Sequence, residues 1–231
     1  MIQLAPDVFL IPLAPRFAIN AYLLGDVLID AGTRYSAARL LRALRGRSVS
    51  AHALTHAHPD HQGASHAVCT RLGIPLWTSA LEAAAAVSGD LRSQLPNSFP
   101  ARLEQRYWAG PGHPVTRLLR AGDRVHDFEV LEVPGHSPGH LAFWRARDRV
   151  LIAGDVLSNL DLRTLRSGLR EPPAIFTPDA PANRASLRRL AALRPEVVAF
   201  GHGAPLRDPE ALARFAARLP GAPWSGSGGA L

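Results

Sequence analysis

Residues 55–61 of the chain read Thr-His-Ala-His-Pro-Asp-His, which places three histidines and one aspartate within six residues. The stretch follows an apolar run at 49–55 that is typical of a buried strand, and it precedes a run at 64–72 with helical spacing. Imidazole and carboxylate groups are ligands that suit zinc, iron or manganese. Because side chains alternate along an extended segment, His56 and His58 share one side. The stretch therefore predicts a metal site at the end of a strand.

Three later fragments offer further ligands, and each follows an apolar strand and contains glycine. They read Pro-Gly-His-Ser-Pro-Gly-His at 134–140, Ala-Gly-Asp at 153–155 and Gly-His-Gly at 201–203. Glycine permits close backbone approach at such strand ends. The four ligands at 56–61 are more than one tetrahedral ion with an open position needs. We therefore expect two adjacent metals.

Hydrophobic patterning predicts two consecutive sets of strands and helices. Strands are expected at residues 8–12, 18–24, 27–30, 49–55, 74–78, 125–133, 141–145, 150–152 and 196–200. Helices are expected at 36–44, 64–72, 80–87, 182–193 and 209–219, with irregular stretches at 88–114 and 157–181. This order suits an α/β fold in which two sheets carry helices on their outer faces. We expect one domain over 1–231, with a mobile tail at 225–231.

The composition narrows the classes of function. All 26 basic residues are arginine, so lysine Schiff-base chemistry is excluded. The net charge of +7 comes from scattered arginines rather than a basic run, so a nucleic-acid partner is not expected. The single cysteine, Cys69, suits a reducing compartment, and the first residues lack a basic n-region. The apolar runs are too short to cross a membrane. We expect a cytoplasmic protein with a small-molecule substrate.

The four fragments in this order resemble the metallo-β-lactamase-fold hydrolases, and their ligand set is similar to that of the glyoxalase II-like branch. The resemblance runs from the first strands to Gly203. It implies a four-layer αβ/βα sandwich with the site at one edge, between the sheets. It also implies two groups of three ligands around a bridging carboxylate: His56, His58 and His136 for one metal, Asp60, His61 and His202 for the second, and Asp155 between them.

Such a site predicts hydrolysis without a protein nucleophile. Two metals about 3.5–4 Å apart can share a water and lower its pKa from about 15.7 towards 7. The bridging hydroxide would attack a carbonyl, with Asp155 as the bridging ligand and Asp60 orienting the nucleophile. We therefore expect a dinuclear metal-dependent hydrolase of a small-molecule ester, thioester or lactone. Zinc is the expected metal, with iron or manganese as alternatives.

Several residues near these fragments have two interpretations. Asp30, at the end of a predicted strand, either hydrogen-bonds a ligand histidine or caps a turn. His140 is expected to position the turn that carries His136. Asn20 and Tyr22 match an Asn-x-Tyr feature of many relatives and are expected to be structural.

The irregular stretches hold the candidate substrate pocket. Their aromatic residues either form a wall for the substrate or anchor their own loops. These residues are Phe99, Tyr107, Trp108 and Phe176.

The substrate is less constrained than the chemistry. Relatives that cleave glutathione thioesters use basic residues after the bridging aspartate, whereas Val-Leu-Ser-Asn occupies 156–159 here, which argues against that substrate. Homoserine lactonases often place a tyrosine there, and none of the three tyrosines of this chain lies at that position. One alternative is a mononuclear iron oxidoreductase of the persulfide dioxygenase type, which holds iron with two histidines and an aspartate. The weakest alternative is a protein that binds or hydrolyses nucleic acid.

Overall fold

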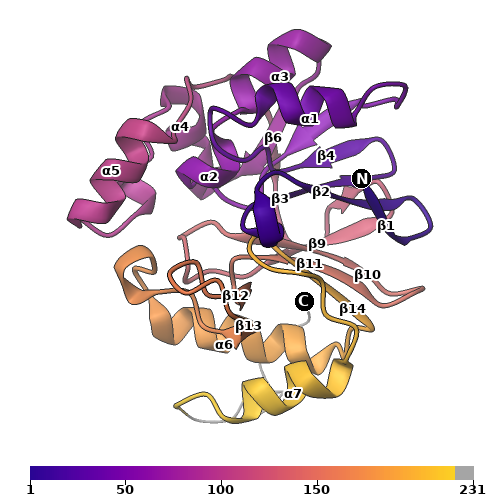
Figure 1. The fold of residues 1–231 in the computed structure, drawn as a ribbon, viewed down its shortest axis with the longest axis vertical. Helices are drawn as coiled ribbons and strands as arrows, with labels where there is room; N and C mark the ends of the chain where they lie inside the picture. Colours follow the sequence, from indigo (N-terminus) through magenta and orange to yellow (C-terminus); the bar gives the residue numbers. More distant parts are fainter. Residues whose placement is uncertain (222–231) are drawn as a thin grey trace.

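Two β-sheets pack face to face and helices cover the outer face of each in the computed structural model, which describes residues 1–221 (Figure 1). One set of helices, α1 to α5, lies on the side of the first sheet, and α6 and α7 lie against the second (Figure 1). The predicted α/β sandwich of four layers is confirmed. The predicted tail at 225–231 lies outside the described residues.

The first sheet has seven strands in sequence order. They are β1 (Ile2–Ala5), β2 (Val8–Pro12), β3 (Asn20–Leu24), β4 (Val27–Ile29), β5 (Ala51–Ala53), β6 (Leu76–Ser79) and β7 (Val115–Leu119). Strands β1 to β4 form an antiparallel meander, and β4 to β7 pair in parallel. The parallel strands are joined by helical crossovers, which is the connection that parallel pairing requires.

The second sheet has five strands in the order β14-β11-β10-β9-β8. They are β8 (Arg124–Val125), β9 (Phe128–Glu132), β10 (Leu141–Arg145), β11 (Val150–Gly154) and β14 (Val197–Phe200). Only β11 and β14 pair in parallel within this sheet. A separate hairpin pairs β12 (Ser158–Leu160) with β13 (Ser167–Arg170).

Seven α-helices and three short 3-10 helices complete the described residues. The α-helices are α1 (Ala37–Ala43), α2 (Pro59–Gln62), α3 (Ser65–Leu72), α4 (Ala80–Ser88), α5 (Phe99–Tyr107), α6 (Ala180–Ala192) and α7 (Pro209–Ala217). The 3-10 helices are η1 (Pro15–Phe17), η2 (Arg92–Gln94) and η3 (Ala174–Phe176). Within this part of the chain, none of the helices has the length and apolar character needed to cross a membrane.

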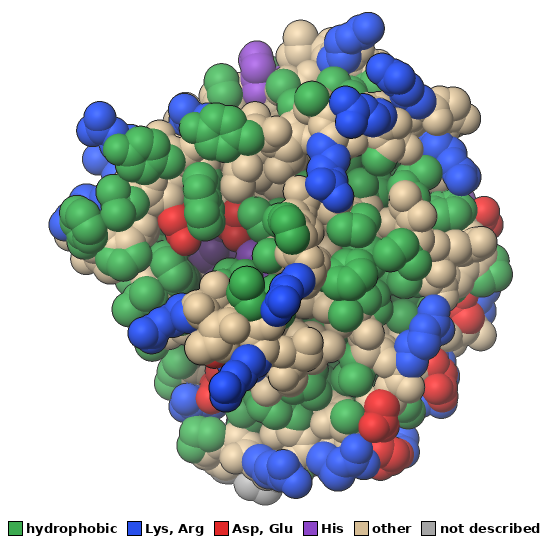
Figure 2. Space-filling model, viewed as in Figure 1, with side chains coloured by type: hydrophobic (Ala, Val, Ile, Leu, Met, Phe, Trp, Pro, Cys, Tyr) green, Lys and Arg blue, Asp and Glu red, His purple; other side chains and the backbone are tan. Residues whose placement is uncertain are grey.

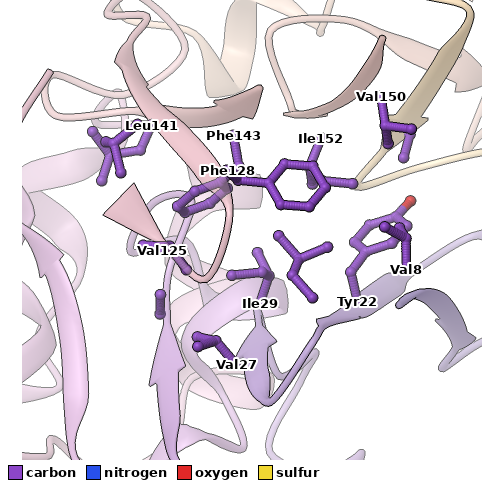
Figure 3. Packing of buried hydrophobic residues seen from close by; sticks show 14 of the residues in the cluster. Val8, Tyr22, Val27, Ile29, Val125, Phe128, Leu141, Phe143, Val150 and Ile152 are labelled. Carbon is purple, nitrogen blue, oxygen red and sulfur yellow. The ribbon is translucent and has the colours of Figure 1, made fainter. Parts of the chain in front are cut away.

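The principal core lies between the two sheets (Figure 3). Val8, Tyr22 and Ile29 of the first sheet face Phe128 and Phe143 of the second in this layer (Figure 3). Alternation along each strand sends the intervening residues to the outer layers, where they pack on the helices. Burial on both faces explains why these strands read as continuous apolar runs in the sequence.

Parallel pairing brings the ends of the functional strands to one edge of the sandwich. β4 and β5 end side by side, and so do β11 and β14. Ligands bind outside the carboxyl ends of such strands because the following loops converge there. The fragments after β5, β11 and β14 therefore lie at a common edge.

The expectation of an irregular stretch at 88–114 was wrong in part, because this segment contains η2 and α5. Its prolines suggested a loop, yet Pro100 occupies the first turn of α5, where a missing N–H costs nothing. Ser98 begins the helix, and its Oγ accepts a hydrogen bond from the amide of Ala101 at 3.2 Å.

The second irregular stretch, 157–181, was also wrong in part. It contains the β12–β13 hairpin and η3, and an ion pair of 2.6 Å between Arg170 and Asp161 closes the hairpin. The expected strand at 125–133 is two strands, because the chain turns at His126, whose φ is 51°. Strands β1 and β7 had not been expected.

Candidate metal centre

Five elements deliver the seven predicted ligands to one place. His56 and His58 follow β5, while Asp60 and His61 lie in the single turn of α2. The other three follow the strands β9, β11 and β14, and they are His136, Asp155 and His202. All seven side chains are buried. Their ligand atoms form overlapping groups within 4.8 Å, namely His56, His58 and His136; His56, His61 and Asp155; and Asp60, His61 and His202.

The carboxylate of Asp155 lies between two of these groups, the one with His136 and the one with His202. Its Oδ2 atom is 2.9 Å from Nε2 of His202 and 3.4 Å from Nε2 of His61. The same oxygen is 3.6 Å from Nε2 of His136, which belongs to the other group. One oxygen therefore faces imidazoles of both groups, as a bridging ligand requires.

In each of these histidines, one ring nitrogen points away from the cluster and is called the outer nitrogen here. It makes a hydrogen bond to the protein, and this bond fixes the tautomer of the ring. Nδ1 of His61 faces Asp30 at 2.8 Å, and Nδ1 of His202 faces the carbonyl of Ala18 at 2.6 Å. His58 is turned the other way, with Nε2 against the carbonyl of Gln94 at 3.0 Å.

Hydroxyl groups hold two further histidines of the predicted ligand set in the same way. Nδ1 of His56 lies 3.0 Å from Oγ1 of Thr55, and Nδ1 of His136 lies 3.2 Å from Oγ1 of Thr177. Each threonine donates its own proton elsewhere, so it accepts from the imidazole. These bonds leave the opposite ring nitrogen free to bind a metal.

Three of the inner nitrogens lack hydrogen-bond partners within the described residues, which fits a metal site. Nε2 of His56, His61 and His136 is buried without a hydrogen-bond partner, and so is Oδ1 of Asp155. Such orphaned atoms are costly unless a ligand satisfies them. Because these donors are imidazole nitrogens and a carboxylate oxygen, the residues fit one or more transition-metal ions.

Burial keeps the histidines of one group, His56, His58 and His136, in the neutral form. Burial lowers the pKa of His58 to about 4 despite its bond to Gln94. Burial and neighbouring imidazoles lower the pKa of His56 and His136 well below the usual value. Neutral imidazoles are the form that binds metal.

The group of Asp60, His61 and His202 lies close to several carboxylates. Burial alone would lower the pKa of His61 and His202, but Asp155 and its neighbouring carboxylates outweigh it and raise both pKa values well above the ordinary one. His202 and His61 likewise hold the pKa of Asp155 well below its usual range, although burial opposes this. The site therefore contains buried negative charge that attracts cations.

Of the two interpretations of Asp30, the structure supports a hydrogen bond to a histidine of the predicted ligand set. Asp30 is buried behind His61, and it also accepts hydrogen bonds from the amide and hydroxyl of Thr55, each at 2.8 Å. Its φ of 57° is rare for a residue other than glycine. Asp30 thus orients His61 directly and His56 through Thr55.

His140 has contacts beyond the turn that carries His136. Its Nε2 accepts a hydrogen bond from the amide of Asp155 at 3.0 Å, and its ring stacks on His56 with 4.6 Å between centroids. Burial lowers the pKa of His140 to about 3. The side chain therefore positions the backbone of Asp155, a role that the sequence did not indicate.

Asn20 and Tyr22 tie the first sheet to the loop of His202. Nδ2 of Asn20 donates to the carbonyls of Phe200 and Gly203, both at 2.9 Å, and the hydroxyl of Tyr22 donates to Phe200 at 2.6 Å. The two sheets are thus fixed relative to each other at the edge where the ligands meet.

The sequence did not indicate three groups that hold residues of the site in place. They are Thr177, the carbonyl of Gln94 and Glu82. Thr177 lies near η3, far along the chain from His136, and a backbone carbonyl leaves no signal in a sequence. Glu82 lies in the first turn of α4, where an acidic residue ordinarily reads as solvent-exposed, yet it is fully buried.

The predicted aromatic wall lies on α5 and η3, which contact each other. Phe99 is 65% exposed and Tyr107 is 50% exposed on α5, while Trp108 and Phe176 are half-buried. Figure 2 shows histidine and acidic side chains at the bottom of a hollow that hydrophobic side chains surround. Contact of these aromatic residues with substrate stays a prediction.

Glu104, also on α5, was not expected near the site. Burial and the charges of Asp60 and Asp155 together raise the pKa of Glu104 to about 8, although His202 and His61 act in the opposite direction. Its half-buried carboxyl therefore lies within the electric field of the ligand cluster, and α5 itself contacts α2, which carries Asp60.

Comparisons with known proteins agree with this geometry. A family model described as "Metallo-beta-lactamase superfamily" matches residues 14–202. The chain is 30% identical over 201 residues to "Probable metallo-hydrolase YflN" of Bacillus subtilis, covering 78% of this chain and 76% of that protein. It is 34% identical over 109 residues to "Hydroxyacylglutathione hydrolase GloC" of Haemophilus influenzae, covering 45% and 48%. The solved structure of TTHA1623 "in a di-iron-bound form" superposes with a TM-score of 0.66 and 34% identity, covering 89% and 97%.

Proposed function

The chain belongs to the metallo-beta-lactamase superfamily and is a metal-dependent hydrolase, and from this premise we propose that it uses two metal ions to hydrolyse a small-molecule ester, thioester or lactone. One observation carries the proposal. Oδ2 of Asp155 faces Nε2 of both His202 and His136, which belong to different groups of ligands. A carboxylate in that position is suited to bridge two ions.

The charge balance supports more than one cation. Asp30, Asp60 and Asp155 are all buried at the site, and no arginine takes part in the ion pairs that the structure describes for them. Buried carboxylates need a compensating charge. Two divalent ions, when bound, would supply it without protonation of the histidines.

The chemistry divides between the ions and the side chains. When bound, a pair of divalent ions lowers the pKa of a shared water and polarises a carbonyl oxygen. Asp155 and the histidines would set the positions of the ions. The histidine rings are fixed because their outer nitrogens make hydrogen bonds. Asp60, whose side chain is 10% exposed, would orient the attacking water.

The segment after Asp155 argues against glutathione as the leaving group. Val156 and Leu157 are fully buried, so they present no charge to a substrate. The polar groups of Ser158 and Asn159 are bonded to the carbonyls of Leu160 and Ala204. The relationship to a hydroxyacylglutathione hydrolase still supports a thioester as a substrate class, with a smaller thiol as the leaving group.

Zinc remains the metal that we propose, and the di-iron form of TTHA1623 makes iron the first alternative to measure. The ligands accept either ion. We also propose a cytoplasmic location, since the one cysteine, Cys69, is free and buried.

The experiment is a panel of p-nitrophenyl esters, acyl thioesters, S-lactoylglutathione and lactones, assayed with the wild type and with Asp155→Ala. We expect the wild type to hydrolyse at least one class and Asp155→Ala to lose that activity together with bound metal. Asp90→Ala is the matched control, because Asp90 pairs with Arg92 at the surface. Full activity in Asp155→Ala would contradict the proposal.

A further inference from the structure

Glu82 makes three hydrogen bonds that join two ligand-bearing segments. Its Oε2 accepts from the amide of Ala57 at 2.9 Å, and its Oε1 accepts from the hydroxyl of Ser137 at 2.7 Å and the amide of Gly139 at 2.8 Å. The side chain is fully buried. A buried carboxylate with three donors is a rigid connection.

The positions of these donors show which segments Glu82 connects. Ala57 lies between His56 and His58, and Ser137 follows His136. These three histidines form one of the groups of potential ligands. Glu82 therefore contacts both segments that supply this group, and its described hydrogen bonds reach neither α2 nor the loop of His202.

Local packing supports this close approach. A Cβ atom at Gly139 would overlap Oγ of Ser79 and lie 2.9 Å from Cγ of Glu82. Glycine at 139 thus lets the backbone reach the carboxylate. Burial raises the pKa of Glu82, while its three hydrogen bonds act in the opposite direction.

We propose that Glu82 is a positioning residue that sets the spacing of His56, His58 and His136, and so the affinity of that one metal position. The inference rests on the proposed metal centre. Residues behind metal ligands commonly change metal affinity 10- to 100-fold when they are replaced. The selectivity for one position follows from the segments that Glu82 joins.

Glu82→Gln tests the proposal with little change in volume. Whichever way the amide is placed, its NH2 group faces a backbone amide of Ala57 or Gly139, so a donor meets a donor. The site loses at least one of its three hydrogen bonds. Ser137→Ala removes one donor and keeps the carboxylate, so its effect should have the same direction and be smaller.

The readout is zinc affinity by competition with chelators, measured as two separate binding steps. We expect the wild type to hold two ions. In Glu82→Gln one step should weaken 10- to 100-fold while the other changes less than threefold. Cobalt-loaded protein gives a second readout, because the absorption spectrum of the weakened position should change.

Asp148→Asn controls for general destabilisation. Asp148 pairs with the buried Arg145 at the end of β10 remote from His140, so its loss should lower stability and leave both metal steps unchanged. Equal weakening of both steps in Glu82→Gln, or unchanged affinity, would overturn the inference. A wild type that binds no metal would overturn the proposed function instead.

Discussion

Nδ1 of His61 lies 2.8 Å from Oδ2 of Asp30, and both side chains are buried. This bond directs Nε2 of His61 towards Asp155 and leaves it without another hydrogen-bond partner in the described residues. A carboxylate behind a ligand histidine fixes the ring and raises its basicity. Asp30 thus orients His61 for the metal binding that we propose.

Replacing Asp30 with asparagine should therefore weaken metal binding and hydrolysis. The carboxylate of Asp30 accepts all three of its described hydrogen bonds, so the NH2 group of asparagine would face Thr55 or His61. We expect a 10- to 100-fold loss of zinc affinity, measured by chelator competition. Asp123→Asn, at a half-buried residue beside Arg120, should bind metal as the wild type does. Equal affinities in both variants would refute this role for Asp30.

Gly201 should be intolerant of any side chain. A Cβ atom there would overlap Oδ1 of Asp155 and lie 2.6 Å from Cε1 of His61. Displacement of these groups by about 1 Å can cost about 100-fold in rate. We expect Gly201→Ala to lose at least that much in kcat/KM, together with metal.

Gly46→Ala is the control for this substitution. Gly46 has a φ of 73° with open space around it, so alanine strains only the backbone. It should lower the free energy of unfolding by about 1 kcal/mol and leave metal content unchanged. Normal metal content in Gly201→Ala would show that the site adapts.

Sequence reasoning succeeded where local signals were strong. The predicted strands at 8–12 and 141–145 coincide with β2 and β10, because continuous apolar runs mark strands buried on both faces. The histidine-rich fragments also lie together, since each follows a strand that ends at the same edge. The site residues that could be predicted were those close in sequence to the end of a strand.

The failures have physical causes as well. The prolines of 88–114 suggested a loop, although Pro100 fits the first turn of α5. Glu104 was missed with that helix, and its position near the ligand carboxylates depends on how α5 packs on α2. Glu82 and Thr177 act across long sequence distances, and no local pattern reports such contacts.

The buried His52 predicts a loss of stability in acid. Burial is the main cause that lowers its pKa from 6.5 to about 4. The unfolded chain therefore takes up the proton more readily, so the stabilisation is present above pH 6.5 and is lost as the pH falls towards 4. By pH 5 the loss should be about 2 kcal/mol.

The measurement compares unfolding free energies of metal-free wild type and His52→Gln at pH 7 and pH 5. The advantage of the wild type should shrink by about 2 kcal/mol between these conditions. Parallel pH dependences of the two proteins would contradict the assignment of this change to His52.

Cys69 should be inert in the folded protein. The thiol is 1% exposed, and burial raises its pKa to about 12. Thiolate is the reactive form, so a disulfide reagent at pH 8 should not label the native chain. The same reagent should label one thiol per chain in guanidinium chloride. Rapid labelling of the native protein would contradict the described packing of α3.

The most direct test of the account is the metal content of freshly purified protein, measured by elemental analysis against protein concentration. The account predicts close to two transition-metal ions per chain, and fewer in Asp155→Ala. One iron per chain with no hydrolysis would contradict the dinuclear centre and favour an iron oxidoreductase. Full hydrolytic activity in protein stripped of metal would contradict the account altogether.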